Sequence, residues 1–199
     1  MSRFSRLSLS LLGAQLLLFP AIASAHLGTG AVGGFQSGFI HPLTGLDHII
    51  AMVGVGILGA FLGHKARWTL PVIFPLVMSV GGVLGIIGFP VPYVETGIAL
   101  SGVVIGLMIA TGSKKIPLWL AGVLVAVFAI CHGYAHGEEM PGAANALTFA
   151  IGFVLATGML HLAGIAIGLL EKVRYGTIVL RLIGLGIAIL GGCFLFGIL

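Results

Sequence analysis

The chain has 199 residues, of which 59% are hydrophobic and only 7% are charged. A soluble globular domain carries about 25% charged residues, so this chain has too few charges to build a water-facing surface. Its net charge of +4 comes from scattered basic residues that form no patch. Composition therefore predicts a membrane protein and excludes a nucleic-acid-binding protein.

The first 25 residues have the pattern of a signal peptide. Arg3 and Arg6 form a basic segment, an apolar stretch runs from Leu7 to Phe19, and residues 23–25 (Ala-Ser-Ala) form a small-x-small cleavage site. Cleavage after Ala25 is expected, which leaves residues 26–199 as one membrane domain. The alternative is an uncleaved first helix, but a spanning helix needs about 20 apolar residues.

Six apolar stretches follow, and they predict an all-α, polytopic membrane protein with six transmembrane helices. The stretches are Phe39–Gly63, Trp68–Gly88, Val94–Thr111, Ile116–Ile130, Ala143–Leu170 and Thr177–Phe196. The fourth is short and is expected to continue to His132.

The loops between these stretches alternate in charge. Lys and Arg occur at 64–67, 112–115 and 171–174, whereas 89–93 and 132–142 contain neither. The positive-inside rule places the basic loops in the cytoplasm. With six spans after a cleaved signal, both ends of the mature chain are then predicted to be periplasmic. Arg181, inside the last span, is expected to extend its side chain back to the interface.

Ionisable side chains inside a span are functional candidates, since an Asp or Arg at the bilayer centre costs about 2.5–3.5 kcal/mol. The first such group is in the segment from His41 to Met52. On one continuous helix His41 and His48 face within about 20° of each other, with Gly45 and Met52 on the same stripe. Two imidazoles and a thioether on one stripe predict a metal-lining face.

Asp47 lies in the same segment but points about 100° away from His48 on an ideal helix. It is expected to support an imidazole from another helix, as carboxylates behind metal ligands do. Distortion of the turn by Pro42 and Gly45 would instead bring Asp47 in. The plain alternative is an Asp–His pair that only tethers two helices.

The second group lies between Cys131 and Pro141. His132, His136 and Glu139 fall on one helix face, and histidines at i and i+4 are a common chelating arrangement. Imidazoles with carboxylates suit nickel, cobalt, zinc or copper(II). The segment is predicted to form the outer entrance, and the alternative is a solvated polar loop.

The remaining candidates are weaker. Met52, Glu138, His161 in the fifth span, and His26 as the mature N-terminus are possible metal ligands, and His161 is as well explained as a hydrogen-bonded packing residue. Together the candidates predict a path that steps inward from His132, His136 and Glu139 to His41, then to Asp47 and His48, then to His161. The metal is a transported substrate, and no bound cofactor is expected. Cys131 and Cys193 are expected to be free buried thiols, with a disulfide as the open alternative.

The two motifs resemble those of the HupE/UreJ family of nickel/cobalt permeases. The pattern H-P-x-x-G-x-D-H-x-x-A-M reads from His41 to Met52, and F-H-G-x-A-H-G-x-E reads from Cys131 to Glu139 with Cys131 in place of Phe. The resemblance implies secondary uptake of Ni²⁺ or Co²⁺ across the bacterial inner membrane, in support of hydrogenase or urease maturation. It also implies metal handling by His41, Asp47, His48, His132, His136 and Glu139.

Two other functions compete with transport. An intramembrane metal-dependent hydrolase needs about three protein ligands and an open water position on one ion. Ligands divided between the outer surface and the membrane centre favour a path over such an enzyme. A metal-binding accessory or sensor protein would bind the ion without moving it.

Overall fold

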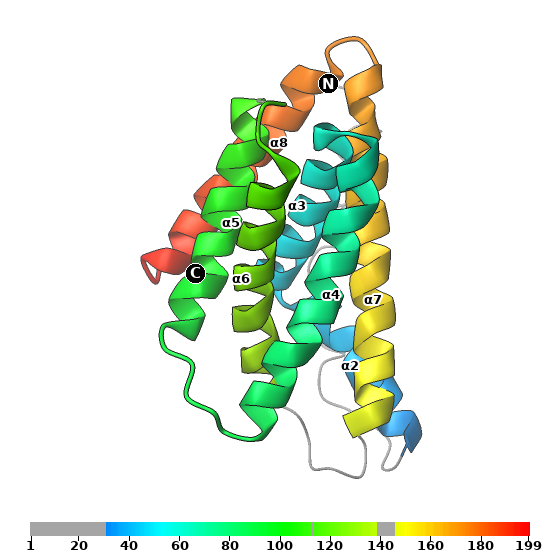
Figure 1. Cartoon of the computed structure of the whole chain (residues 1–199), viewed down its shortest axis with the longest axis vertical. Coiled ribbons are helices and arrows are strands. Elements are labelled where there is room, and N and C mark those ends of the chain that lie inside the picture. The colour runs from blue at the N-terminus through cyan, green and yellow to red at the C-terminus, as the bar shows by residue number, and fades with distance from the viewer. Residues whose placement is uncertain (1–30, 113, 139–145) are drawn as a thin grey trace, which may run out of the picture.

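The computed structural model describes residues 31–112, 114–138 and 146–199, and in these residues the chain is all-α (Figure 1). The helices are α2 (Ala31–Thr44), α3 (Leu46–Leu62), α4 (His64–Ile86), α5 (Val94–Thr111), α6 (Leu118–Glu138), α7 (Ala146–Gly168), the 3-10 helix η2 (Leu169–Lys172) and α8 (Gly176–Leu195). The predicted signal peptide and its cleavage site lie outside the described residues.

Five of these helices are long and apolar enough to cross a membrane, and a bent pair raises the number to six. The predicted all-α fold is therefore confirmed, and the predicted six spans are reached only if the bent pair counts as one span. The prediction that the first span is one continuous helix is wrong, because α2 and α3 meet at an angle of 79°. Pro42 lacks a backbone N–H, and Gly45 between the helices is extended (φ −84°, ψ 116°).

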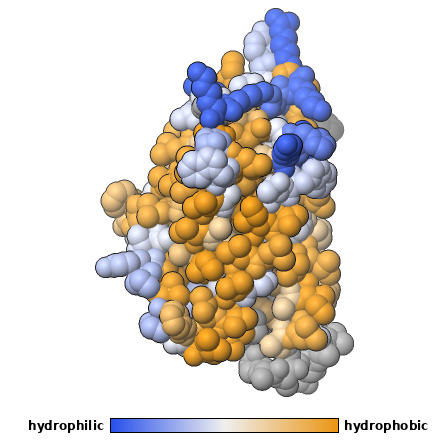
Figure 2. Space-filling view, in the orientation of Figure 1, coloured by the Kyte–Doolittle hydropathy of each residue, from blue (hydrophilic) through white to orange (hydrophobic). Residues whose placement is uncertain are grey.

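Helix α3 is the centre of the bundle. It contacts α2, α4, α5, α6, α7 and α8, and 12 of its 17 residues are buried. Outer helices instead expose large apolar side chains such as Leu76, Leu182 and Met159. The side of the molecule in Figure 2 is accordingly hydrophobic over most of its height, as a lipid-facing surface must be.

The hydrophilic residues gather at one end of the bundle (Figure 2). Gly63, residues 114–117 and residues 169–175 lie at this end, and Lys114 pairs there with Glu171. Arg181 donates from Nε to the carbonyl of Ala110 at 2.8 Å, near the end of α5. The predicted alternation of basic and non-basic ends, and the return of Arg181 toward the basic end, are therefore confirmed.

Helix α6 is longer than predicted and continues through the second motif to Glu138. It packs directly on α4: a Cβ on Gly133 would lie 1.9 Å from the Met78 carbonyl oxygen, and one on Gly137 would lie 2.2 Å from that of Gly82. Small residues let the two backbones touch, which outweighs the low helix propensity of glycine. The alternative of a solvated polar loop is thus wrong for residues 131–138.

Candidate metal centre

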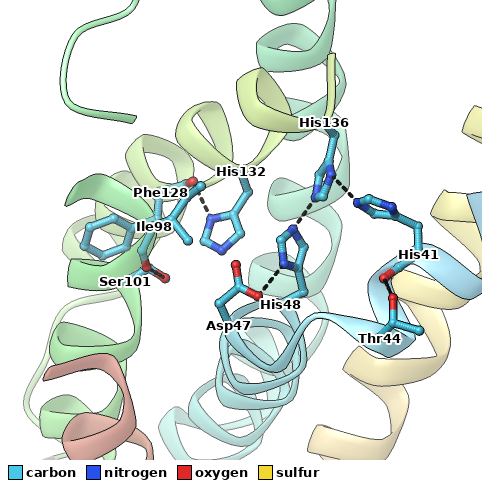
Figure 3. A network of polar contacts seen from close by, with 9 residues as sticks. All are labelled: His41, Thr44, Asp47, His48, Ile98, Ser101, Phe128, His132 and His136. Carbon is cyan, nitrogen blue, oxygen red and sulfur yellow. Dashed lines mark hydrogen bonds and ion pairs between the residues drawn. The ribbon is translucent and has the colours of Figure 1, made fainter. Parts of the chain in front are cut away.

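Four histidines from three helices form one group, which we call the histidine cluster: His41 on α2, His48 on α3, and His132 and His136 on α6 (Figure 3). The ring centroid of His48 lies 4.3 Å from that of His136 and 5.4 Å from that of His132. His41 Nε2 lies 3.0 Å from His136 Nδ1, and His48 Nε2 contacts His136 Nε2. His48, His132 and His136 are buried.

The break before α3 positions the carboxylate. Asp47 lies in the first turn of α3, where the helix dipole stabilises negative charge, and its Oδ1 is 2.9 Å from His48 Nδ1. A Cβ on Gly45 would lie 2.9 Å from both of these atoms, so glycine leaves them room. The break pairs Asp47 with its own neighbour His48, which agrees with the predicted alternative of a turn distorted by Pro42 and Gly45, and not with support of an imidazole from another helix.

The imidazole of His132 is oriented by a backbone carbonyl. Its Nδ1 lies 2.9 Å from the Phe128 carbonyl oxygen, so Nδ1 carries the proton and Nε2 carries the lone pair. The ring is fully buried, and Nε2 has no hydrogen-bond partner among the described residues. An imidazole whose Nδ1–H is tied to a carbonyl or carboxylate is the usual form of a metal-binding histidine.

His136 connects His41 to His48, and one set of neutral tautomers is consistent with the two contacts between these rings. Asp47 favours a proton on His48 Nδ1, which leaves His48 Nε2 as an acceptor for the N–H at His136 Nε2. His136 Nδ1 then accepts from His41 Nε2. In this arrangement the carboxylate favours one tautomer of His48, and the tautomers of His136 and His41 follow from it.

The donor set fits a late first-row transition metal, for which imidazole is a preferred ligand. The rings currently bond to one another, and in the described part of the chain no three His, Cys, Asp or Glu side chains surround a single point at ligand distance. Two nitrogens bound to one tetrahedral ion are about 3.4 Å apart at bond lengths near 2.1 Å. An ion that enters between His41 and His136 therefore separates their nitrogens by only a few tenths of an ångström, and it takes the place of the proton that they share.

Asp47, the partner of His48, lines a polar cavity of about 370 Å³. Glu95, at the start of α5, lines the same cavity, together with the C-terminal residue Leu199. Glu95 is exposed in the first turn of α5. Two carboxylates that line one cavity favour a divalent cation there. The sequence gives no sign that Glu95 and Asp47 are close, because the two residues lie on different helices.

The other predicted ligands that the structure describes, Met52, Glu138 and His161, are not part of the cluster. Met52 is fully buried in the apolar core, and Glu138 is exposed at the last residue of α6. Glu139 and His26 lie outside the described residues. His161 is buried on α7, where its ring is 5.5 Å from that of Phe74.

The stepped order predicted for the path is also wrong for the outer residues. His132 and His136 meet His41 and His48 at one depth range because α2 folds across the bundle at the bend. Phe74 on α4, which contacts both His132 and His161, has no distinguishing signal within an apolar span. Cys131 and Cys193 are free and half-buried, in agreement with the predicted free thiols and not with a disulfide.

Comparison with known proteins agrees with the motifs. The family described as HupE / UreJ protein matches residues 14–194. Protein HupE of Rhizobium leguminosarum bv. viciae is 44% identical over 181 residues, which cover 91% of this chain and 94% of that protein. No solved structure matches the chain. The chain therefore belongs to the HupE/UreJ family.

Proposed function

We propose that the chain is a secondary permease that takes up a divalent transition metal, Ni²⁺ or Co²⁺, through the histidine cluster. The observation that carries the proposal is the pair His48 and His132. His48 Nδ1 lies 2.9 Å from Asp47 Oδ1, His132 Nδ1 bonds to the Phe128 carbonyl, and the Nε2 atoms of both rings point into the cluster. Such pre-oriented imidazoles in the interior of an apolar bundle suit a metal ion that crosses the membrane.

The cavity beside the cluster supplies the entry. A hydrated cation is first attracted by Glu95 and Asp47, then exchanges water for His48, and then for His136, His41 and His132. Ca²⁺ and Mg²⁺ prefer all-oxygen sites, so nitrogen donors select against them. The choice of nickel or cobalt among the late metals follows the family resemblance.

The family resemblance also supports an inference about the membrane and the enzymes that this activity serves. We infer a multi-pass protein of the bacterial inner membrane whose metal serves hydrogenase or urease maturation. Uptake, rather than catalysis or metal sensing, is the activity inferred for the cluster.

Uptake by whole cells tests the proposal. Cells without their own nickel uptake system are expected to accumulate ⁶³Ni²⁺ or radioactive cobalt when they express the chain. Replacement of both His41 and His48 by alanine removes two of the four imidazoles, and accumulation is expected to fall to the level of the empty vector. Equal membrane abundance of the two proteins is the control, and uptake that survives the double replacement contradicts the proposal.

The carboxylate is expected to act through His48. Asp47→Asn keeps the shape but removes the charge that fixes the proton on His48 Nδ1, and metal affinity is expected to fall about 10–100-fold. Titration of the purified protein with Co²⁺ measures this loss. Glu171→Gln, the same change at the opposite end of the bundle, is expected to leave the affinity unchanged. Equal effects of the two replacements would show that Asp47 has no specific role.

A further inference from the structure

His161 has an unusual environment for a buried histidine. It is 2% exposed, and neither Nδ1 nor Nε2 has a hydrogen-bond partner among the described residues. Thr157, one turn earlier on α7, is completely buried, and its Oγ1 is also without a partner there. Residues four apart lie on the same helix face, so three unpartnered polar atoms are close together.

Unpartnered polar groups of this kind are rare, because each buried one costs about 1–3 kcal/mol. A Ser or Thr hydroxyl in a helix usually donates a hydrogen bond to the backbone carbonyl four residues earlier. Thr69 and Ser79 in this chain use it, with Oγ to carbonyl distances of 2.8 Å. Thr157 does not, although it is more deeply buried than either residue. The hydroxyl and the imidazole are thus left available for a ligand.

His161 lies on the far side of Phe74 from His132. The Phe74 ring lies 5.5 Å from the rings of both His132 and His161. Along α6, His132 is about 21 Å from the start of the helix at the basic end, whereas His161 is about 10 Å from the end of α7 at the same side. His161 therefore lies nearer the basic end than the cluster does, with Phe74 between the two histidines.

A route onward from His161 also exists. A cavity of about 190 Å³ at the basic end is lined by Gly168, two turns after His161 on α7, and by Glu171. We propose that His161 and Thr157 form an inner transit site for the divalent metal, between the histidine cluster and this end of the bundle. The inference rests on the permease function proposed above.

The donors suit transit more than storage. One imidazole nitrogen and one hydroxyl oxygen leave most of the coordination sphere to water, so the ion is held weakly and can leave. Conduction requires several such moderate sites, since an ion that binds too tightly at one of them stops. The inner site accepts the ion from His132 once the Phe74 ring moves aside.

Measurements of Ni²⁺ flux and of equilibrium Ni²⁺ binding distinguish the inner transit site from the histidine cluster. In proteoliposomes, His161→Gln and Thr157→Val are expected to lower Ni²⁺ flux by about tenfold or more, the scale seen when a group that serves a metal site is lost. Equilibrium binding of Ni²⁺ at the cluster is expected to stay within about twofold of native. His64→Gln, an exposed histidine at the basic end, is the matched control and is expected to change neither quantity.

Native flux in both inner variants would overturn the inner site while leaving the permease proposal intact. No flux from the native chain would instead contradict the permease proposal itself. If a variant fails to fold, a second measurement remains. Co²⁺ added to the His161→Cys protein is expected to give a thiolate-to-cobalt absorption band that the native protein, with only Cys131 and Cys193, does not show. Absence of that band from folded His161→Cys protein would also overturn the inference.

Discussion

Replacing His136 with alanine is expected to abolish metal binding and uptake. His136 is the ring that contacts both His41 and His48, so its loss removes a ligand and also the link between α2 and α3 at the site. Loss of a group that only supports a metal ligand already costs about 10–100-fold in affinity, so the loss of this ring is expected to cost about 100-fold or more. Titration with Ni²⁺ or Co²⁺ measures the affinity directly.

Two further variants distinguish chemistry from packing. His136→Phe keeps an aromatic ring against Phe153, whose centroid is 4.5 Å away, but has no nitrogen, and it is expected to be as inactive as the alanine variant. His64→Ala removes an exposed histidine and is expected to bind like the native protein. Normal affinity in His136→Phe would show that the ring serves only to fill space.

Gly133→Ala is expected to be the most destabilising single-methyl change in the site region. The added Cβ would lie 1.9 Å from the Met78 carbonyl oxygen and 2.9 Å from the Gly82 nitrogen, both in the backbone of α4. A helix backbone does not yield as a side chain does, so α4 must move away from α6. Overpacking of this kind costs about 1–3 kcal/mol or more. The shift also displaces His132, which is adjacent to Gly133, and His136, which lies one turn further along α6.

Thermal unfolding in detergent, with metal titration of the same sample, checks this expectation. Gly158→Ala is the matched control, since nothing lies within 4 Å of a Cβ at that position on α7. Alanine favours a helix over glycine by about 1 kcal/mol, so the control is expected to be as stable as the native protein or more stable. Equal unfolding temperatures for the two variants would contradict the close α4–α6 packing.

Hydropathy and charge predict much of this fold, because lipid imposes simple rules on a chain. The apolar stretches coincide with α4, α5, α7 and α8 to within a few residues, and the basic loops meet at one end as the charge pattern predicts. The break at Gly45 is different. Its position depends on how α2 packs on α7, and Pro42 and Gly45 permit a bend without setting its angle.

The residues of the candidate site are also predictable, but their arrangement is not. Ionisable groups are rare in this chain, so the four histidines and Asp47 stand out in the sequence as candidates. Spacing on an ideal helix placed Asp47 away from His48, whereas the broken helix pairs the two. The roles assigned to Glu95, Phe74 and Gly133 come from contacts between helices, which no single stretch of sequence displays.

The cluster brings its histidines together where a stepped arrangement was expected, and this changes the mechanism. The Asp47-linked series of His48, His136 and His41 shares protons that a divalent ion must replace. Entry of metal is therefore expected to move protons between ring nitrogens, since each neutral imidazole keeps one N–H and offers its other nitrogen to the ion. The inner residues His161 and Thr157 then provide a second, weaker position before release.

The most direct test of the account is uptake of ⁶³Ni²⁺ and radioactive cobalt by proteoliposomes that contain only the purified chain, measured with and without a pH gradient and beside a His48→Ala control. The account predicts that the native chain carries at least one of the two metals above the rate of empty liposomes, and that the control does not. Folded native protein that binds metal but gives no flux, or equal flux through the His48→Ala protein, would contradict it.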